Sequence, residues 1–79
     1  MTVLSVVAVG RLTERHVREA GQPVPVEEVV RWLVDAVGVA DDRARAGVRL
    51  AVTVGRLETT TDDDDRPSLR IPTEREAAA

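Results

Sequence analysis

The sequence lacks several residue types, and each absence removes a class of function. Its 79 residues contain no cysteine, phenylalanine or tyrosine. They contain a single histidine, His16, and a single tryptophan, Trp32. Without cysteine there is no disulfide framework or thiolate metal site, and one histidine cannot build a histidine-rich metal centre. Ser5 lies in an apolar run and Ser68 beside Pro67, so neither has the context of a catalytic nucleophile. We expect no enzyme activity, no cofactor and no metal.

Long hydrophobic runs are also missing. The longest apolar stretch, residues 3–9, is interrupted by a serine and is far shorter than the ~20 residues that a membrane span needs. The N-terminus carries no basic region of the kind that opens a secretion signal. These features predict a cytoplasmic protein with no membrane partner.

Charge is distributed unevenly along the chain. All eleven basic residues are arginine, and the formal net charge is −3. Residues 1–61 are balanced, whereas residues 62–79 carry six acidic residues against three arginines. This balance argues against a general nucleic-acid coat, but it leaves room for a local arginine patch.

Residues 26–37 show the clearest helical pattern. Their apolar residues recur with the spacing of one helical face, and their charged residues fall on the other. Pro25 suits the first turn of such a helix and Gly38 the position after its last turn. Trp32 falls roughly 90° or more from the centre of the apolar face, at about 100° per residue, so we expect it to be half-buried.

Residues 41–54 fit two patterns. A helix would begin with Asp41 as its N-cap, but Gly47 in its interior would cost about 1 kcal/mol relative to alanine. Residues 48–54 also alternate with a period of two, which is typical of a strand. We favour the helix, because the segment 41–46 is rich in residues that favour one.

The two interpretations make opposite structural predictions. The helix buries Val48 and Ala51 and exposes Arg49. The strand instead pairs residues 48–54 with residues 3–9 in a ladder.

Residues 56–72 are typical of a β-hairpin. Alternating segments flank an acidic turn at Asp62–Asp65, and Pro67 and Pro72 fall at strand ends. Clustered carboxylates suit Mg²⁺ or Ca²⁺, but this run lacks the spaced ligands, glycine and closing glutamate of an EF-hand loop. We interpret it as a solvated turn.

The first third of the chain is less regular. Residues 3–9 fit either a buried strand or the first turns of a helix. Thr13 is a suitable cap for a helix over 14–20 that ends at Gly21, so we expect a break near Gly10.

Domain boundaries follow from these elements. An extended connector is expected at 22–24. We predict one domain over residues 1–72 and a short acidic and alanine-rich tail over 73–79, whose start at 73–76 has the form of a capping box.

In this order of elements, residues 13–76 resemble a winged helix-turn-helix domain. The sequence Gly-Gln-Pro-Val-Pro-Val-Glu-Glu-Val-Val at 21–30 resembles the entry to its second helix. Residues 38–45, Gly-Val-Ala-Asp-Asp-Arg-Ala-Arg, resemble the turn and the start of its recognition helix, and residues 55–58 the step into the wing. Asp-Arg followed by Leu-Arg-Ile-Pro-Thr-Glu within 62–74 is similar to the wing of the multiple-antibiotic-resistance regulator family.

The resemblance implies a mainly α fold with a C-terminal β-hairpin. It also implies phosphate contacts from arginines of the recognition helix and the wing, with base edges read by the first turns of that helix. The arginines at those positions are Arg43, Arg45, Arg49, Arg66 and Arg70. The chain would then be a DNA-binding transcriptional regulator that binds duplex DNA as a dimer, because one such module has a modest interface.

Two alternatives stay open. The alternative fold is a small α+β domain with a three-stranded antiparallel sheet. The alternative function is a protein-interaction module or assembly adaptor without DNA binding, which the acidic balance favours. Trp32, at the margin of its helix, is the candidate anchor for a protein partner or a homodimer.

Overall fold

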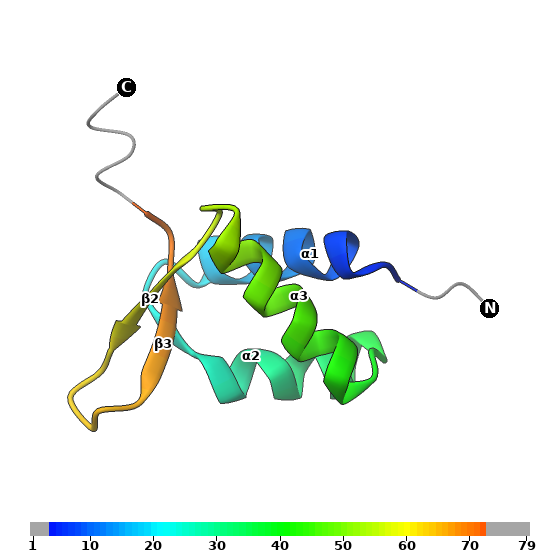
Figure 1. Cartoon of the computed structure of the whole chain (residues 1–79). Helices are drawn as coiled ribbons and strands as arrows, with labels where there is room; N and C mark the ends of the chain where they lie inside the picture. The colour runs from blue at the N-terminus through cyan, green and yellow to red at the C-terminus, as the bar shows by residue number, and fades with distance from the viewer. Residues whose placement is uncertain (1–3, 73–79) are drawn as a thin grey trace.

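The chain forms a small α+β domain of helices packed on an antiparallel sheet (Figure 1). The computed structural model describes residues 4–72, so the predicted tail and its capping box lie outside the described residues. In this range the elements are helices α1 (Val6–Ala20), α2 (Val26–Trp32) and α3 (Asp41–Thr53), strands β1 (Val24–Pro25), β2 (Glu58–Thr61) and β3 (Pro67–Arg70), and a π-helical segment, η1 (Leu33–Val37), that continues α2.

The sheet has three strands, with β3 in the centre and β1 and β2 on either side. Both pairings are antiparallel, and Leu69 of β3 lies opposite Val24 of β1 and Thr59 of β2. Strands β2 and β3 confirm the predicted hairpin. The third strand comes from the segment predicted to be an extended connector. The described residues therefore agree with the alternative prediction of a small α+β domain with a three-stranded antiparallel sheet, whereas the mainly α fold with a hairpin alone lacks β1.

Helix α3 confirms the helical interpretation of residues 41–54, and the strand interpretation is wrong. Val48 is 6% exposed and Ala51 1% exposed, whereas Arg49 is exposed. The predicted N-cap is displaced by one residue, because Ala40 takes the extended backbone of the cap and Asp41 is the first helical residue. The carboxylate of Asp41 is therefore not a cap and contacts Arg45.

The predicted break near Gly10 is wrong, because α1 runs through it without interruption. Ser5 caps this helix, and its Oγ accepts the backbone N–H of Ala8 at 3.1 Å. Thr13 is fully buried in the middle of the helix, where its hydroxyl donates to the carbonyl oxygen of Val9 at 2.9 Å. Gly21 ends the helix in the left-handed conformation, as predicted.

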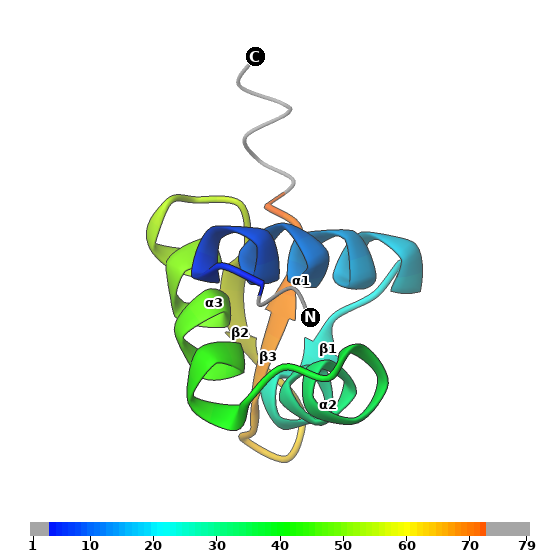
Figure 2. The same cartoon turned by 90° about the vertical axis from the view of Figure 1, so that its right-hand side faces the viewer.

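Helices α1 and α3 pack against each other (Figure 2). Each has a glycine at this contact. A Cβ atom on Gly47 would lie 2.3 Å from Cγ1 of Val9, and one on Gly10 would lie 3.2 Å from the carbonyl oxygen of Gly47. The two backbones therefore approach closely, and side chains of ordinary size do not fit between them. This contact explains why α3 retains a glycine that lowers its intrinsic helix propensity.

The predicted helix over 26–37 is confirmed, with its last turn widened into η1. Pro25 stands one residue earlier than predicted, at the N-cap of α2. Gly38 has a φ of 88°, and the next N–H, that of Val39, donates back to the carbonyl oxygen of Leu33 at 3.0 Å. The polypeptide thereby turns sharply from α2 into α3.

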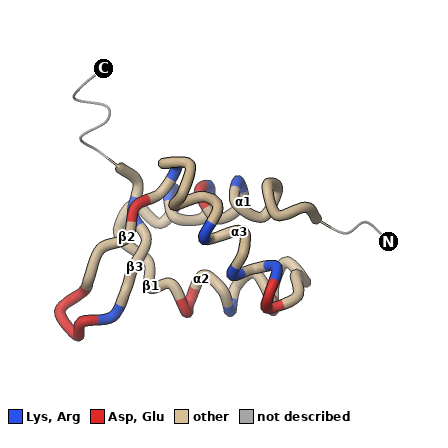
Figure 3. The backbone as a smooth tube through the Cα atoms, in the orientation of Figure 1, with Lys and Arg blue, Asp and Glu red and all other residues tan. Residues whose placement is uncertain are grey.

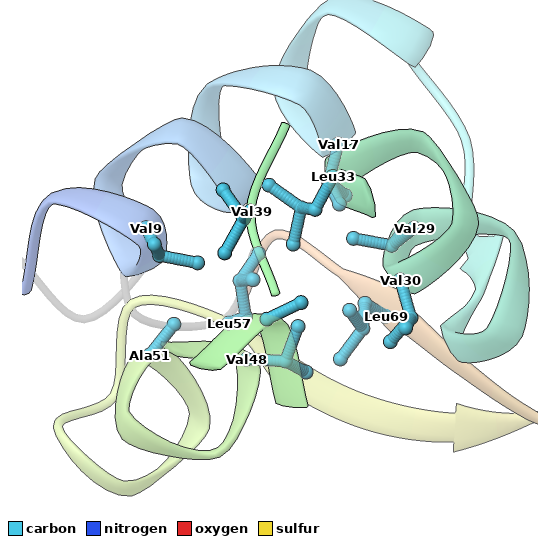
Figure 4. Packing of buried hydrophobic residues seen from close by; sticks show 11 residues of the cluster. Val9, Val17, Val29, Val30, Leu33, Val39, Val48, Ala51, Leu57 and Leu69 are labelled. Atoms are coloured by element: carbon cyan, nitrogen blue, oxygen red, sulfur yellow. The ribbon is translucent and has the colours of Figure 1, made fainter. Parts of the chain in front are cut away.

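One apolar cluster joins the helices to the sheet (Figure 4). Leu33, Leu57 and Leu69 are each 1% exposed or less and come from η1, the loop before β2 and strand β3. The remaining buried members are small or β-branched: Val9, Val17, Val29, Val30, Val39, Ala44, Val48 and Ala51. The core therefore fixes α3 and the hairpin relative to each other.

Candidate interaction surfaces

A groove of about 350 Å³ separates α3 from the hairpin, and we call it the α3–hairpin groove. It brings together two of the five arginines predicted to contact DNA, Arg45 and Arg49. The rest of its lining is mostly apolar and comes from α2, α3, β2 and β3: Val26, Val30, Val48, Val52, Thr53, Thr59, Pro67 and Leu69.

Arg45 is held by two carboxylates. Its Nε donates to Asp41 at 2.9 Å, and its two terminal nitrogens donate to the two carboxylate oxygens of Glu27 at 3.0 and 3.1 Å. The bidentate hydrogen bonds and the positive charge of Arg45 lower the pKa of Glu27 and, reciprocally, raise the pKa of Arg45. The pair joins α3 to the start of α2, and all three side chains face solvent.

Arg49 is different from Arg45, although it lies one turn away on the same helix. It is exposed, and within residues 4–72 it takes part in no ion pair. It is therefore the predicted arginine that offers its guanidinium most directly to a partner in the α3–hairpin groove.

Arg43 does not line this groove. Its side chain is half-buried, and Nη1 donates to the carbonyl oxygen of Leu4 at 3.1 Å. The guanidinium therefore joins the first turn of α3 to the segment that precedes α1.

Acidic residues gather at the tip of the hairpin (Figure 3). Arg66 pairs with two of them. Its side chain lies 3.3 Å from Asp64 and 3.7 Å from Asp62. Asp62 also orders the turn, because its Oδ1 accepts the backbone N–H groups of Asp64 and Arg66 at 2.9 and 2.8 Å. Asp65 takes the left-handed conformation, with a φ of 61°, which aspartate tolerates better than most residues. Part of the acidic run at 62–65 therefore serves to form the turn.

Arg70 pairs with Glu58 across β2 and β3. Its neighbour Leu69 points into the core, so alternation along the strand directs Arg70 to the other face of the sheet. The structure therefore separates Arg70 from Arg45 and Arg49.

Trp32 is half-buried, as predicted from its place on the helical face. Its ring stacks on His16 of α1, with centroids 4.0 Å apart and planes 16° apart. One face of the indole is thus covered by this chain, and the stack connects α2 to α1. Nothing in the sequence pattern pairs these two residues.

A second groove lies between α1 and the C-terminal half of α3, and we call it the α1–α3 groove. Its volume is about 550 Å³. Two valines on its border are exposed large hydrophobic residues, Val7 at 53% and Val54 at 57%. The rest of the lining is Gly10, Glu14, Arg18, Leu50, Ala51, Gly55, Arg56, Ile71 and Pro72. Sequence reasoning missed this groove, because residues 3–9 fitted strand and helix equally.

Charges at the rim of the α1–α3 groove are arranged around Glu14. Its carboxylate accepts hydrogen bonds from Arg18 at 2.9 Å and from Arg56 at 3.1 Å. The second bond joins α1 to the loop that follows α3. Glu14 is only 19% exposed, so both arginines help to cover it.

Within residues 4–72 no group of three or more histidine, aspartate or glutamate side chains is arranged to hold a metal ion. No helix of the described part of the chain is long and apolar enough to cross a membrane. Comparisons with models of protein families, with curated proteins and with solved structures found no match.

Proposed function

We propose that this chain is a winged-helix protein-interaction module. The winged-helix part is supported by the order helix, strand, helix, helix, hairpin, with the first strand beside the last. As far as residue 72, where the described residues end, that order agrees with the sequence resemblance. A fold of this kind hosts more than one function, so the choice between protein and DNA depends on the surface.

The observation that carries the proposal is the pairing of the arginines. Arg45, Arg66 and Arg70 are each engaged by a carboxylate of this chain. A phosphate that bound one of them would lie next to that carboxylate, and the repulsion would oppose the attraction on which DNA affinity depends. A protein partner can match a surface of mixed sign, because it also carries both charges.

The shape of the α3–hairpin groove agrees with this conclusion. Val26 and Val52 are partly exposed, and Pro67 is exposed. An apolar side chain of a partner would fill this groove, and an acidic neighbour on that partner would reach Arg49. Apolar residues inside a charged rim are the usual composition of a protein interface.

Titration with a mixed-sequence DNA duplex at low salt tests the proposal. We expect no binding by the natural chain. A variant with Glu27→Gln, Asp41→Asn and Asp42→Asn should acquire salt-dependent binding, because it removes negative charge around Arg45 without changing side-chain size. Binding by the natural chain, with a log–log salt slope that falls by about one in Arg49→Ala, would contradict the proposal.

DNA binding is the second candidate, and the exposure of Arg49 favours it. Arg49 and Arg45 are one turn apart on the helix that would lie in the major groove. On this model Arg45→Ala and Arg49→Ala each lower the slope by about one. Arg70→Ala, on the other face of the sheet, is the matched control and leaves the slope unchanged.

A further inference from the structure

We propose that the free edge of β2 binds an extended peptide segment of a protein partner, which pairs with it as a fourth strand and places an acidic side chain against Arg49. The inference rests on the proposed function, because it names the kind of segment that enters the α3–hairpin groove. Main-chain hydrogen bonds to a sheet edge would supply affinity, and the groove would select the side chains.

The first observation is the direction of the backbone groups in β2. This strand stands at one end of the sheet and, in the described part of the chain, pairs with β3 alone. At the start of the turn, the N–H of Asp62 donates to the carbonyl oxygen of Arg66 at 3.0 Å. Hydrogen-bonded and non-hydrogen-bonded positions alternate in an antiparallel pair. Thr60 therefore directs its N–H and C=O to β3, whereas Thr59 and Thr61 direct theirs to the free edge.

The opposite edge of the sheet shows how such pairing is prevented. Strand β1 has two residues and leads directly into α2. Leu69 directs its backbone groups away from β2 and toward Val24, so the outward positions around β1 are those of Pro23 and Pro25. Proline has no N–H, and it is one means by which edge strands avoid pairing. Strand β2 has four residues and no proline, so its edge is the one that can accept a strand.

The second observation is the position of this edge beside the α3–hairpin groove. Thr59 lies opposite Leu69, which is buried in the core, so both side chains lie on the face of the sheet that the helices cover. Thr59 is nevertheless exposed, and it lines the groove. Alternate side chains of a strand added beside β2 would therefore point toward the same groove. Val52 and Pro67 in its lining would contact the apolar ones among them.

The third observation is the charge of the groove, which selects an acidic residue in the segment. Arg49 takes part in no ion pair within residues 4–72, whereas Arg45 already has two carboxylate partners. A glutamate or aspartate on the groove side of the added strand would pair with Arg49. The tip of the hairpin is acidic (Figure 3), and it would repel a segment that is acidic throughout. A nucleic acid, with a phosphate at every step, would meet the same repulsion.

The test begins with a library of random peptides of about eight residues, within the usual length of a strand. The library is displayed and selected on the immobilised full chain. We expect enriched sequences with apolar side chains at alternate positions and an aspartate or glutamate among them. A synthetic copy of the most enriched sequence is the selected peptide. A selection that enriches nothing, or that enriches sequences without this alternation, would overturn the inference.

Amide hydrogen exchange followed by NMR reports the pairing directly. In the chain alone, the N–H of Thr60 should be protected by β3, and those of Thr59 and Thr61 should exchange freely. Saturation with the selected peptide should slow exchange at Thr59 and Thr61 by about tenfold or more, with Thr60 as the internal control. Binding without this protection would overturn strand addition. Protection of Thr59 and Thr61 in the chain alone, increasing with its concentration, would assign the edge to a second copy and would also overturn the inference.

Two substitutions at one position separate the main chain from the side chain. Thr59→Pro removes an N–H that faces the free edge and leaves the pairing with β3 in place, so it should weaken binding of the selected peptide by about tenfold or more. Thr59→Val keeps this N–H and the shape of the side chain and should leave the dissociation constant nearly unchanged. Arg49→Ala should weaken binding by about threefold, as for an exposed ion pair. Circular dichroism with cooperative unfolding checks that each variant is folded.

N-methylation of the selected peptide, one residue at a time, requires no change in the protein. It should weaken binding at every second residue, because only alternate N–H groups of an added strand face β2. Equal binding by all the methylated peptides would overturn strand addition, whether or not Thr59→Pro folds.

The remaining outcomes separate this inference from the proposed function. Peptide binding without the main-chain effects overturns strand addition, yet it agrees with a protein-interaction module that uses side chains alone. DNA binding with a salt slope that depends on Arg49 contradicts the proposed function, whereas the exchange data still decide whether β2 pairs with a peptide.

Discussion

The two sides of α3 differ in how they make contact. On the side of α1, the helix meets its neighbour through Gly47, and no space remains for one additional carbon atom. On the side of the hairpin, Arg45 and Arg49 extend into solvent beside a groove. The first side determines how the helices pack, whereas the second presents charged side chains to a partner. The effects of substitutions on stability should therefore differ between the two sides, both in size and in their dependence on pH and salt.

The largest effect is expected for Gly47→Ala. Alanine favours a helix by about 1 kcal/mol relative to glycine. At a solvent-facing position this change would therefore stabilise the protein. Here the new Cβ would lie 2.3 Å from Cγ1 and 2.6 Å from Cβ of Val9, which forces α1 and α3 apart. Overpacking typically costs about 1–3 kcal/mol and occasionally more, and contacts this short belong at the upper end of that range. After the gain of about 1 kcal/mol in helix propensity, we expect a net loss of about 2 kcal/mol or more in chemical denaturation.

Two further variants sharpen this prediction. Val9→Ala alone creates space and loses core contacts, but in the Gly47→Ala background it should recover part of the stability, because it removes Cγ1. The two substitutions should therefore be clearly non-additive. A Gly47→Ala variant as stable as the natural chain would show that the backbones are not this close.

The contact at Gly47 also shows what the sequence could and could not predict. The helix over 26–37 and the hairpin over 56–72 were predictable, because their periodicity, turn residues and end signals are local. Gly47 argued against a helix and Gly10 suggested a break, since each glycine was assessed within its own segment. The two glycines, 37 positions apart in the sequence, allow α1 and α3 to approach closely, and this role can be recognised only once the two helices are in contact.

The candidate site divides in the same way. The Asp41–Arg45 pair was within reach of sequence reasoning, because residues four apart on a helix are neighbours. The pairs of Arg45 with Glu27 and of Arg43 with Leu4 join residues 18 and 39 positions apart, and only the packing of α2 and α1 on α3 determines them. The arginines and the local partner Asp41 were therefore predictable from the sequence, but the distant partners Glu27 and the Leu4 carbonyl were not.

A smaller effect is expected for Trp32→Ala, which tests a contact between α1 and α2. Truncation of a fully buried tryptophan to alanine lowers the free energy of unfolding by about 3–5 kcal/mol. Trp32 is half-buried, so we expect Trp32→Ala to lower the free energy of unfolding by about 2 kcal/mol in chemical denaturation. A double-mutant cycle with His16→Ala should give a coupling of about 0.5–1.5 kcal/mol from the stacked rings. Because Trp32 lies outside the lining of the α3–hairpin groove, the variant should bind the selected peptide as the natural chain does. Loss of peptide binding without loss of stability would instead assign the interface to the Trp32 edge.

The smallest effect belongs to the exposed side of α3 and depends on pH. The hydrogen bonds and charge of Arg45 lower the pKa of Glu27 from its ordinary value of 4.5. A carboxylate whose pKa is lower in the folded state contributes stability that is complete above its unfolded pKa and is lost as the pH falls through its folded pKa. We therefore expect the natural chain to be slightly more stable than Glu27→Gln at pH 7.

The difference between the two proteins should be constant down to about the ordinary pKa of 4.5 and should shrink at lower pH. Denaturation midpoints measured in parallel from neutral to acidic pH report it directly, and the comparison cancels the titration of the other carboxylates. Because both side chains face solvent, about 1 M salt should also reduce the difference. A difference that does not change with pH would mean that the Arg45–Glu27 pair is not formed in solution. The carboxylate argument against DNA binding at Arg45 would then depend on the Asp41 contact alone.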